Sequence, residues 1–346
     1  MKIVSVVGAR PQFIKVAPIY RAAISHKIEH HVINSGQHYD YEMAEAFFQG
    51  FDITANLTNL DVGSGTHAVQ TASALIKIEE IIQTINPDWM LVYGDTNTTL
   101  AAALYAAKAN IKVAHIEAGL RSRDNGMPEE VNRIIVDHIS TLNFTPTAEG
   151  EKNLELEGLQ STCRLVGDVM IDNLHYFASK LDAKKKNTQK RIIATFHRPS
   201  NVDDPIRLQN IMNKLCTSEF KVVIPAHPRL RKNLERYGTQ FDRSKIELVS
   251  PVPYIEMLKM IFEAKGVVTD SGGLQKETYF LGTPTLTVRN STEWPETLEG
   301  DMNRLDFDLD QLDIFTNIER LDKNLSRLTY GDGDAAKKIL DILMRF

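Results

Sequence analysis

The sequence Thr269-Asp270-Ser271-Gly272-Gly273-Leu274-Gln275-Lys276-Glu277 joins an apolar run, 266–268, to a segment with helical spacing, 274–281. It predicts a strand, a tight glycine turn and a helix start. Paired glycines let an anion approach the backbone N–H groups of the first helical turn. Ser271 adds a hydroxyl donor, and Glu277, one turn on, can accept from sugar hydroxyls. The pattern predicts a diphosphate nucleotide site, with an ordinary turn capped by a serine as the alternative.

The same strand-turn-helix rhythm extends outward in both directions and predicts an α/β fold of two Rossmann-like domains that face a central cleft. The predicted strands are 3–7, 31–34, 89–93, 113–116, 142–145, 164–167, 191–196, 221–226, 245–249, 266–269 and 283–288. The predicted helices are 13–26, a helix through Met43, Ala46 and Phe47, 67–85, 100–109, 131–139, 148–159, 169–181 and 335–343. A polar, basic connection without periodicity at 182–190 indicates that the second domain starts close by. We place the boundary near Gly167, with domains at 1–167 and 168–330, because the helix 169–181 could belong to either half.

Composition excludes several classes of protein. The chain has 346 residues, 42% of them hydrophobic and 25% charged, which suits two globular domains. A formal net charge of −5 gives no reason to expect nucleic acid. Cys163 and Cys216 stand alone, which predicts neither a disulfide framework nor a metal site. No apolar run approaches the roughly 18 residues of a membrane span, so we expect a soluble, cytoplasmic protein.

Carboxylates follow two predicted strands of the first half. Asp95 comes after 89–93, Glu117 after 113–116, and Glu129 opens the helix that begins near Pro128. We expect them at one edge of a parallel sheet, where neighbouring carboxyls push their pKa values apart and can supply both an acid and a base. For Asp95 the alternative is a helix cap, and the neighbouring Glu130 is explained by helix electrostatics.

Cations and imidazoles occupy matching positions. Arg10 lies in the loop at the carboxyl end of the first strand, and Lys15 lies one turn into the next helix. Two cations at this position suit a phosphate. For Lys15 alone, a solvated charge is the simpler explanation. In the second half, His197 and His227 each follow a strand. Arg198 comes directly after His197, and Arg229 comes two residues after His227. Arg289 follows the last strand. Imidazole and guanidinium groups can both stabilise a departing diphosphate.

Seven motifs occur in order along the chain: Gly8-Ala9-Arg10-Pro11-Gln12-Phe13-Ile14-Lys15, Gly36-Gln37-His38, Gly94-Asp95-Thr96, His115-Ile116-Glu117-Ala118-Gly119-Leu120-Arg121, Pro128-Glu129-Glu130-Val131-Asn132-Arg133, Phe196-His197-Arg198, and Asp270-Ser271-Gly272-Gly273 with Glu277. Together they resemble the non-hydrolysing UDP-N-acetylglucosamine 2-epimerases over essentially the whole chain. The resemblance implies a fold of the glycosyltransferase-B type, in which the C-terminal helix, about 331–346, crosses back onto the N-terminal domain. It also implies a homodimer.

The reaction implied by this resemblance inverts C2 of the sugar. A base removes the C2 proton while UDP leaves C1, and UDP then adds back to 2-acetamidoglucal without a metal or other cofactor. The resemblance assigns acid/base and sugar-ring roles to Asp95, Glu117 and Glu129, and stabilisation of the leaving diphosphate to His197. The implied UDP ligands are Arg10, Lys15, Arg133, Ser271, Gly272, Gly273 and Glu277, to which the strand-end positions add His227 and Arg289 as further substrate ligands.

Departures from the family pattern concern the substrate. Members acting on UDP-N-acetylglucosamine often read His-Arg-Arg-Glu at 197–200 and Glu-Arg-Pro-Glu at 293–296, where this chain has His-Arg-Pro-Ser and Glu-Trp-Pro-Glu. Trp294 and the run 276–282 look more like the branch that epimerises UDP-2,3-diacetamido-2,3-dideoxyglucuronate. Val69-Gln70 replaces an Arg-Gln pair associated with activation by a second UDP-sugar, so we do not expect such activation. UDP-N-acetylglucosamine, the substrate of the family's central activity, is the first expectation.

Two other functions fit parts of the pattern. A glycosyltransferase of the same architecture would bind a UDP-sugar through a similar C-terminal site and pass the sugar to an acceptor. It would not explain three carboxylates in the first half. A non-catalytic nucleotide-sugar sensor would bind UDP without any turnover.

Overall fold

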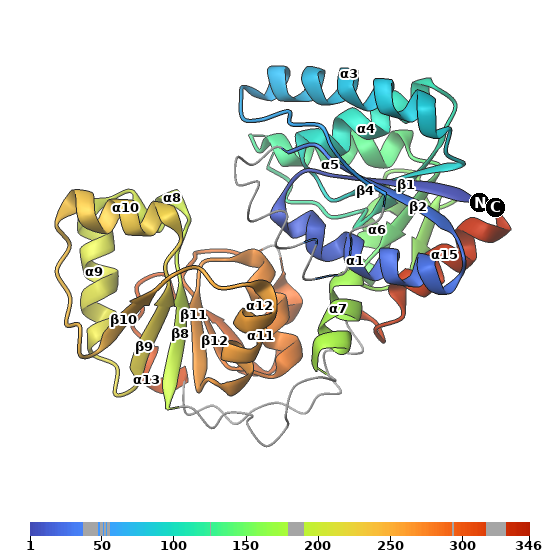
Figure 1. Cartoon of the computed structure of the whole chain (residues 1–346). Coiled ribbons are helices and arrows are strands. Elements are labelled where there is room, and N and C mark those ends of the chain that lie inside the picture. The colour runs from blue at the N-terminus through green and yellow to red at the C-terminus, as the bar shows by residue number, and fades with distance from the viewer. Residues whose placement is uncertain are drawn as a thin grey trace. The chain divides into compact units, whose positions relative to one another are not determined.

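The computed structural model describes residues 1–36, 48, 51, 53, 56–124, 126–178, 190–292, 294–315 and 330–346. Contacts divide the chain into two compact units, Met1–His175 with Leu328–Phe346 and Tyr176–Arg327 (Figure 1). The helix predicted through Met43, Ala46 and Phe47 lies outside the described residues, as does all but the last residue of the connection predicted over 182–190.

The first unit is built on a seven-stranded parallel sheet in the order β3-β2-β1-β4-β5-β6-β7. Its strands are β1 (Lys2–Val7), β2 (Glu29–Asn34), β3 (Leu57–Asn59), β4 (Trp89–Tyr93), β5 (Lys112–Ile116), β6 (Leu142–Thr145) and β7 (Cys163–Leu165). The β-branched runs that predicted strands form the centre of this sheet. The strand order reverses between β1 and β4, and loops that leave the carboxyl ends at such a point form the usual ligand site of an open α/β sheet.

Helices cover both faces of this sheet. They are α1 (Arg10–Ser25), α3 (His67–Ile85), α4 (Asn97–Lys108), α5 (Pro128–Ile139), α6 (Ala148–Leu156), most of α7 (Val169–Ala178) and α15 (Ala335–Arg345). One core cluster joins α3, α4 and α5 to β1, β2, β4 and β5. Ala101, Ala102, Ala103 and Ala106 of α4 are fully buried in it, because small side chains let the helix lie close against the sheet.

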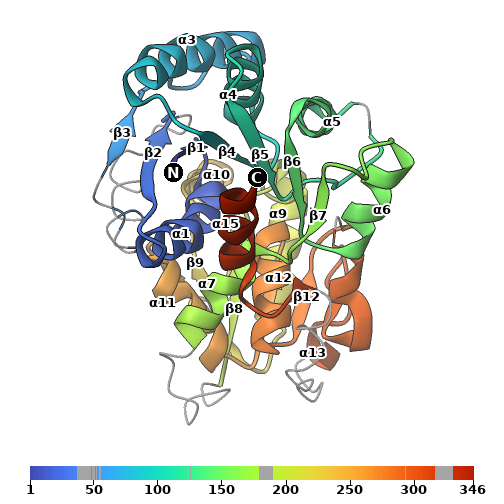
Figure 2. The ribbon, with the colours of Figure 1, turned by 90° about the vertical axis from the view of Figure 1, so that its right-hand side faces the viewer.

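The C-terminal helix α15 belongs to the first unit and lies beside α1 (Figure 2). The backbone N–H groups of Ala335 and Ala336, at its first turn, donate to the carboxylate of Asp172 in α7 at 3.1 and 2.7 Å. At its other end the ring of Phe346 packs edge-on against Trp89 at 5.8 Å.

The division between the units falls after His175, inside the helix that the sequence could not assign to either half, whereas the predicted boundary lies near Gly167. Residues 168–175 stay with the first unit because their side chains bind it. Asn173 donates to the carbonyl of Ile14 in α1, and Asp172 caps α15. Beyond the division, the ring of Phe177 packs against Tyr254 of the second unit at 6.1 Å.

The second unit has a six-stranded parallel sheet in the order β10-β9-β8-β11-β12-β13. Its strands are β8 (Arg191–Thr195), β9 (Lys221–Pro225), β10 (Ile246–Val249), β11 (Gly266–Thr269), β12 (Thr285–Thr287) and β13 (Asn303–Leu305). The order reverses between β8 and β11, so the second candidate ligand edge lies after these strands. The prediction of parallel α/β sheets in both halves is confirmed.

Its helices are α8 (Pro199–Val202), α9 (Pro205–Cys216), α10 (Pro228–Tyr237), α11 (Tyr254–Glu263), α12 (Gly272–Leu281) and α13 (Leu312–Phe315), with a 3-10 segment η2 (Pro295–Asp301). One apolar cluster of this unit packs α8, α9 and α10 on one face of the sheet. Helices α11 and α12 pack against each other beside β11 and β12 (Figure 1). Among the described helices, none combines the length and apolar character needed to span a membrane.

Candidate active site

The predicted site residues fall into two groups, one in each unit. Lys15, Asp95, Glu117, Glu129 and Arg133 lie in the first unit, and His197, His227, Ser271, Gly272, Gly273, Glu277 and Arg289 lie in the second. Arg10 is the first residue of α1 in the first unit. Each group lies at or beside the edge where the strand order of its sheet reverses.

Glu117 lies directly after β5, and its side chain is buried with that of Lys15, with which it forms an ion pair. Its backbone adopts a left-handed φ of 69°, which is uncommon for a residue with a side chain and is often found at functional sites. Gly94, at the end of β4, also has positive φ, and a Cβ added there would lie 3.3 Å from Oε2 of Glu117. A glycine therefore leaves room for the carboxylate, and places it against the loop that carries Asp95.

Asp95 does not cap α4. The N-cap is Thr96, whose hydroxyl accepts from the N–H of Thr99 at 3.3 Å. The carboxylate of Asp95 instead pairs with Arg133 of α5, and the Asp95 carbonyl accepts from Nδ2 of Asn132 at 2.8 Å. Asp95 is therefore held from the α5 side by both side chain and backbone, and its carboxylate stays partly exposed.

A buried glutamine ties the loop after β1 to the loop after β4. Oε1 of Gln12 accepts from the N–H of Gly8 at 2.7 Å and of Ala9 at 3.1 Å, and its Nε2 donates to the carbonyl of Tyr93 at 2.6 Å. Its side chain therefore fixes the spacing of the two loops at the point where the strand order reverses. Gln12 belongs to the first of the seven motifs, and no role was predicted for it from the sequence.

Buried hydrogen bonds and ion pairs hold the segments on either side of Glu117. Nδ1 of His115 donates to Asp137 at 2.6 Å, and Nε2 of His115 lies 2.8 Å from the Gly94 carbonyl. Asp137 also accepts from the N–H of Gly119 at 3.2 Å and pairs with Arg121 at 2.7 Å. Burial alone would raise the pKa of Asp137, but the neighbouring His115 and Arg121 outweigh it and hold that pKa below its ordinary value. These contacts fix both loops that carry the candidate carboxylates.

Glu129 and Glu130 are adjacent in the sequence but have different environments. Glu129 is partly exposed, and within the described parts of the chain no hydrogen bond or ion pair is found for its carboxylate. Glu130 is buried and accepts from the N–H groups of Ser122 and Arg123, both at 2.9 Å, and from Arg133 at 3.0 Å. Burial would raise the pKa of Glu130, but these donors lower it overall. Helix electrostatics alone was the wrong explanation for Glu130, because its carboxylate organises the loop after β5.

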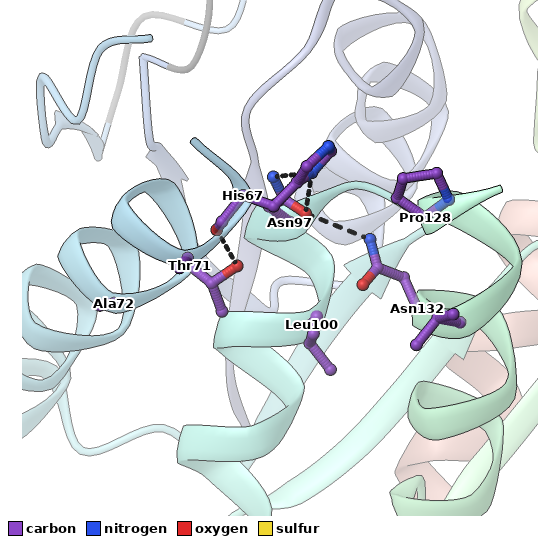
Figure 3. Close-up of a pocket in the computed structure, with 9 residues that line it drawn as sticks. His67, Thr71, Ala72, Asn97, Leu100, Pro128 and Asn132 are labelled. Atoms are coloured by element: carbon purple, nitrogen blue, oxygen red, sulfur yellow. Dashed lines mark hydrogen bonds between the residues drawn. The ribbon is translucent and has the colours of Figure 1, made fainter. Parts of the chain in front are cut away.

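A groove of about 540 Å³ lies between α3, α4 and α5 (Figure 3). It is lined by His67, Ala68, Thr71, Ala72, Asn97, Leu100, Pro128, Val131 and Asn132, among which there is no Asp, Glu, Lys or Arg. Val69 and Ile76 of α3 and Met127 and Ile135 at α5 are exposed nearby along the same helices. We call these four residues and the groove the α3–α5 surface. Its Asn132 is the side chain that binds the Asp95 backbone.

In the second unit, the quoted turn forms the predicted strand, turn and helix. Ser271 is the N-cap of α12 and accepts from the N–H of Leu274 at 3.4 Å, so its hydroxyl hydrogen can still be donated. A Cβ added at Gly273 would meet nothing within 4 Å, so the packing of the protein does not require a glycine there. The space beside the helix N-terminus is of the kind that an anionic ligand can occupy. Glu277 lies one turn further on and is buried.

His197 follows β8 and lies beside Asp270, the first residue after β11. Nδ1 of His197 lies 2.9 Å from the carboxylate of Asp270, which is fully buried, whereas the His197 side chain is 43% exposed. The ring of His227 lies 5.9 Å away, and its Nδ1 accepts from the N–H of Arg229 at 3.2 Å at the start of α10. Arg289 follows β12 and is partly buried. No role was predicted for Asp270 from the sequence, although it follows a strand as Asp95 and Glu117 do.

Two residues singled out as departures from the family pattern contact each other. The ammonium of Lys276 lies 3.8 Å from the centroid of the Trp294 ring, and both side chains are buried. A cation over an aromatic face is a favourable pair, worth about 2 kcal/mol when desolvated. Within the described residues, no group of three or more His, Cys, Asp or Glu side chains could hold a metal ion.

Two parallel α/β sheets, each with polar loops where its strand order reverses, define a two-domain nucleotide-binding architecture. The model of the UDP-N-acetylglucosamine 2-epimerase family matches residues 22–344. A UDP-N-acetylglucosamine 2-epimerase homolog of Methanococcus maripaludis is 45% identical over 99% of both chains. The UDP-2,3-diacetamido-2,3-dideoxy-D-glucuronate 2-epimerase of Pseudomonas aeruginosa is 38% identical over 100% of both.

Solved structures agree with these sequence relationships. The structure of Methanocaldococcus jannaschii UDP-GlcNAc 2-epimerase in complex with UDP-GlcNAc and UDP matches with a TM-score of 0.88 at 36% identity, covering 100% of both chains. The enzyme from Neisseria meningitidis, bound to UDP-GlcNAc, matches with a TM-score of 0.85 at 29% identity, also over 100% of both. The chain therefore belongs to the UDP-N-acetylglucosamine 2-epimerase family and is an isomerase. The resemblance found in the sequence is confirmed.

Proposed function

We propose that this enzyme interconverts UDP-N-acetylglucosamine and UDP-N-acetylmannosamine by elimination and re-addition of UDP. The observation that carries the proposal is the buried Glu117 carboxylate, paired with Lys15 and held in a left-handed backbone conformation against the Gly94-Asp95 loop. An ion pair between two buried side chains is costly to desolvate, which favours a functional reason for keeping it. Family membership supplies the reaction type.

In the proposed reaction, a carboxylate takes the proton from C2, and the C2–H electrons form the C1–C2 double bond. The C1–O bond breaks, and its electron pair leaves with UDP. The sugar turns within the site, UDP adds back to C1, and a proton is delivered to the opposite face of C2. We assign proton transfer and contacts to the sugar ring to Asp95, Glu117 and Glu129, which lie on neighbouring loops of the first unit.

We assign the diphosphate to the N-terminus of α12, with Ser271, Gly272 and Gly273, and the ribose to Glu277. His197, His227 and Arg289 extend from neighbouring strand ends of the same unit. The remaining proposed ligands, Arg10, Lys15 and Arg133, come from the first unit. Lys15 and Arg133 already neutralise carboxylates, so they would be shared between those carboxylates and the phosphates.

An assay without any acceptor tests this function. The enzyme is incubated with UDP-N-acetylglucosamine in deuterated water, and C2 of the sugar is followed by NMR. Deuterium at C2, with formation of the N-acetylmannosamine epimer, supports the proposal. UDP release only after an acceptor is added would instead identify a glycosyltransferase, and UDP binding without exchange would identify a sensor.

A second candidate substrate is UDP-2,3-diacetamido-2,3-dideoxyglucuronate. The buried Lys276–Trp294 contact favours it, because these are the positions at which the chain departs from the pattern of UDP-N-acetylglucosamine enzymes. The Pseudomonas aeruginosa relative supports it as well. Measuring kcat/KM for both UDP-sugars with the same preparation decides between them, since the true substrate should be preferred by orders of magnitude.

We further propose that the enzyme is a homodimer formed through the α3–α5 surface. A two-fold axis brings the same patch of both copies together, so the patch must tolerate itself. Apolar side chains and the absence of charged residues from the groove lining meet this requirement.

The cytoplasmic location expected from the sequence stays a prediction.

A further inference from the structure

A fully buried carboxylate lies beside the imidazole of His197, which is proposed to stabilise the leaving diphosphate. His197 and Asp270 leave neighbouring strands, β8 and β11, whose last residues Thr195 and Thr269 are in register. The hydroxyl groups of these two threonines lie 2.7 Å apart and hold the strand ends together. Asp270 is therefore fixed beside His197 by the pairing of the sheet, at the edge where its strand order reverses.

Every contact found for the Asp270 carboxylate brings it a hydrogen-bond donor. It accepts from the backbone N–H of His197 at 3.1 Å, the N–H of Arg198 at 3.0 Å and Nδ2 of Asn201 at 3.2 Å. Its fourth partner is Nδ1 of the His197 ring at 2.9 Å. A protonated carboxyl would bring its own hydrogen to this cluster. Burial would raise the pKa of Asp270, but the contacts with His197, Arg198 and Asn201 lower it overall, and the group carries a negative charge.

This environment fixes the hydrogen of the imidazole. Facing an ionised carboxylate, Nδ1 of His197 must be the N–H that donates. Nε2 is then the nitrogen left for a ligand, on a side chain that is 43% exposed. To donate from Nε2 as well, the ring must become an imidazolium cation. The charge of Asp270 stabilises that cation, which would balance the charge that develops on a departing diphosphate.

We propose that Asp270 is a positioning residue for His197, which holds the ring with Nδ1 protonated and stabilises the imidazolium whose Nε2–H donates to the departing UDP. This inference rests on the proposed function of the site. It assigns Asp270 no contact with the substrate. Loss of its charge should therefore lower kcat more than it weakens UDP binding.

The first test records NMR spectra of the wild-type enzyme labelled with ¹⁵N-histidine, before and after UDP is added. The His197 resonances are identified by their absence from His197→Gln. We expect Nδ1 to be protonated in the free enzyme, and the Nε2 resonance to shift when UDP is added. A His197 ring with unprotonated Nδ1 would overturn the proposal.

The second test compares variants. Asp270→Asn keeps the size of the side chain, but its uncharged amide can donate to Nδ1, so we expect Nδ1 to lose its hydrogen and kcat to fall by about 10²-fold or more. The Kd for UDP should change by only a few-fold. Asp270→Glu keeps the charge and should recover part of kcat. Asn201→Ala removes another contact of the same carboxylate and should leave the tautomer of His197 as it is, with a loss in kcat below ten-fold.

The outcomes separate this proposal from the proposed function. Wild-type deuterium exchange together with a near-normal kcat for Asp270→Asn would overturn the role of Asp270 alone. A wild-type enzyme that shows the expected tautomer and the UDP-dependent shift, but no exchange at C2, would support the role of Asp270 and contradict the epimerase reaction.

Discussion

Glu117 and Lys15 form a buried ion pair although 102 residues separate them in the sequence. Glu117 comes from the end of β5 and Lys15 from the second turn of α1, so the pair connects the loop after β5 to the helix after β1. An opposite charge at this distance favours the ionised form of a carboxylate. The pair therefore ties the loop that carries Glu117, one of the proposed acid/base residues, to the helix that follows β1.

Replacing Glu117 with glutamine should abolish most of the turnover. The amide has nearly the same size, but it cannot take or deliver a proton, and such groups contribute about 10² to 10⁴-fold to rate. We expect kcat for epimerisation to fall by this factor, with the Kd for UDP changed by only a few-fold. Steady-state kinetics and titration calorimetry measure the two quantities.

A folding control belongs with this variant, because the amide leaves the ammonium of Lys15 buried without its counter-ion. Lys15→Met with Glu117→Gln removes both charges, and this double variant should regain thermal stability without regaining turnover. A Glu117→Gln enzyme that epimerises at a near-normal rate would remove Glu117 from the mechanism.

Most of the fold could be predicted because its signals are local. The central strands are β-branched runs that end in polar loops, and α3 repeats apolar residues on one face through Ala74, Ile78 and Ile82. The strands β3 and β13 were missed because each has three residues and exists only through pairing with its neighbour. The contacts divide the chain after His175, beyond the boundary predicted near Gly167. In α7, Asn173 bonds to Ile14 of the first unit and Phe177 packs on Tyr254 of the second. Both partners are far away in the sequence, so the sequence does not show where along α7 the units divide.

The candidate site could be predicted only where chain position decides it. Asp95 and Glu117 follow strands, so the sequence places them at the correct edge of the sheet. The Lys15–Glu117 pair and the position of Asp270 beside His197 arise from the order of the strands, which the sequence does not give. Glu130 lies in the first turn of a helix, where any acidic residue is favourable. Because this local preference already accounts for a glutamate there, the sequence offers no reason to expect its burial.

Asp137→Asn should destabilise the protein strongly. The variant leaves the buried Arg121 and His115 facing an uncharged amide, and breaking a buried pair from one side costs about 3 kcal/mol or more. Urea unfolding measures the loss. Asp332→Asn, which removes an ion pair with Lys338 in the solvent-exposed part of the same unit, should cost less than about 1 kcal/mol. Equal losses for the two variants would contradict the importance assigned to the buried network.

The carboxyl group of Asp172 should make stability depend on pH. Burial raises its pKa to about 7, against the opposing effect of the N–H groups of Ala336 and Ala335, whereas the ordinary value is 3.8. The folded state therefore binds more protons than the unfolded state between these values, and the stabilisation is lost as pH rises through about 7. Asp172→Asn keeps an oxygen for the α15 N-terminus but cannot ionise.

We therefore expect the free energy of unfolding of the wild type, minus that of Asp172→Asn, to decrease by roughly 2 kcal/mol between pH 5 and pH 8. Urea titrations at several pH values measure this difference. Curves for the two proteins that stay parallel across the range would show that Asp172 titrates elsewhere.

The proposed dimer can be tested at Val131, which lines the groove and is 46% exposed in the single chain. A glutamate there would bring two carboxylates close to the two-fold axis inside an apolar interface, where burying an unpaired charge is costly. Light scattering should give the wild type twice the 39.0 kDa mass of the chain and give Val131→Glu the mass of one chain. Ile206→Glu, at a more exposed position in the second unit, should remain a dimer. A monomeric wild type, or a Val131→Glu protein that stays dimeric, would show that the α3–α5 surface does not join two subunits.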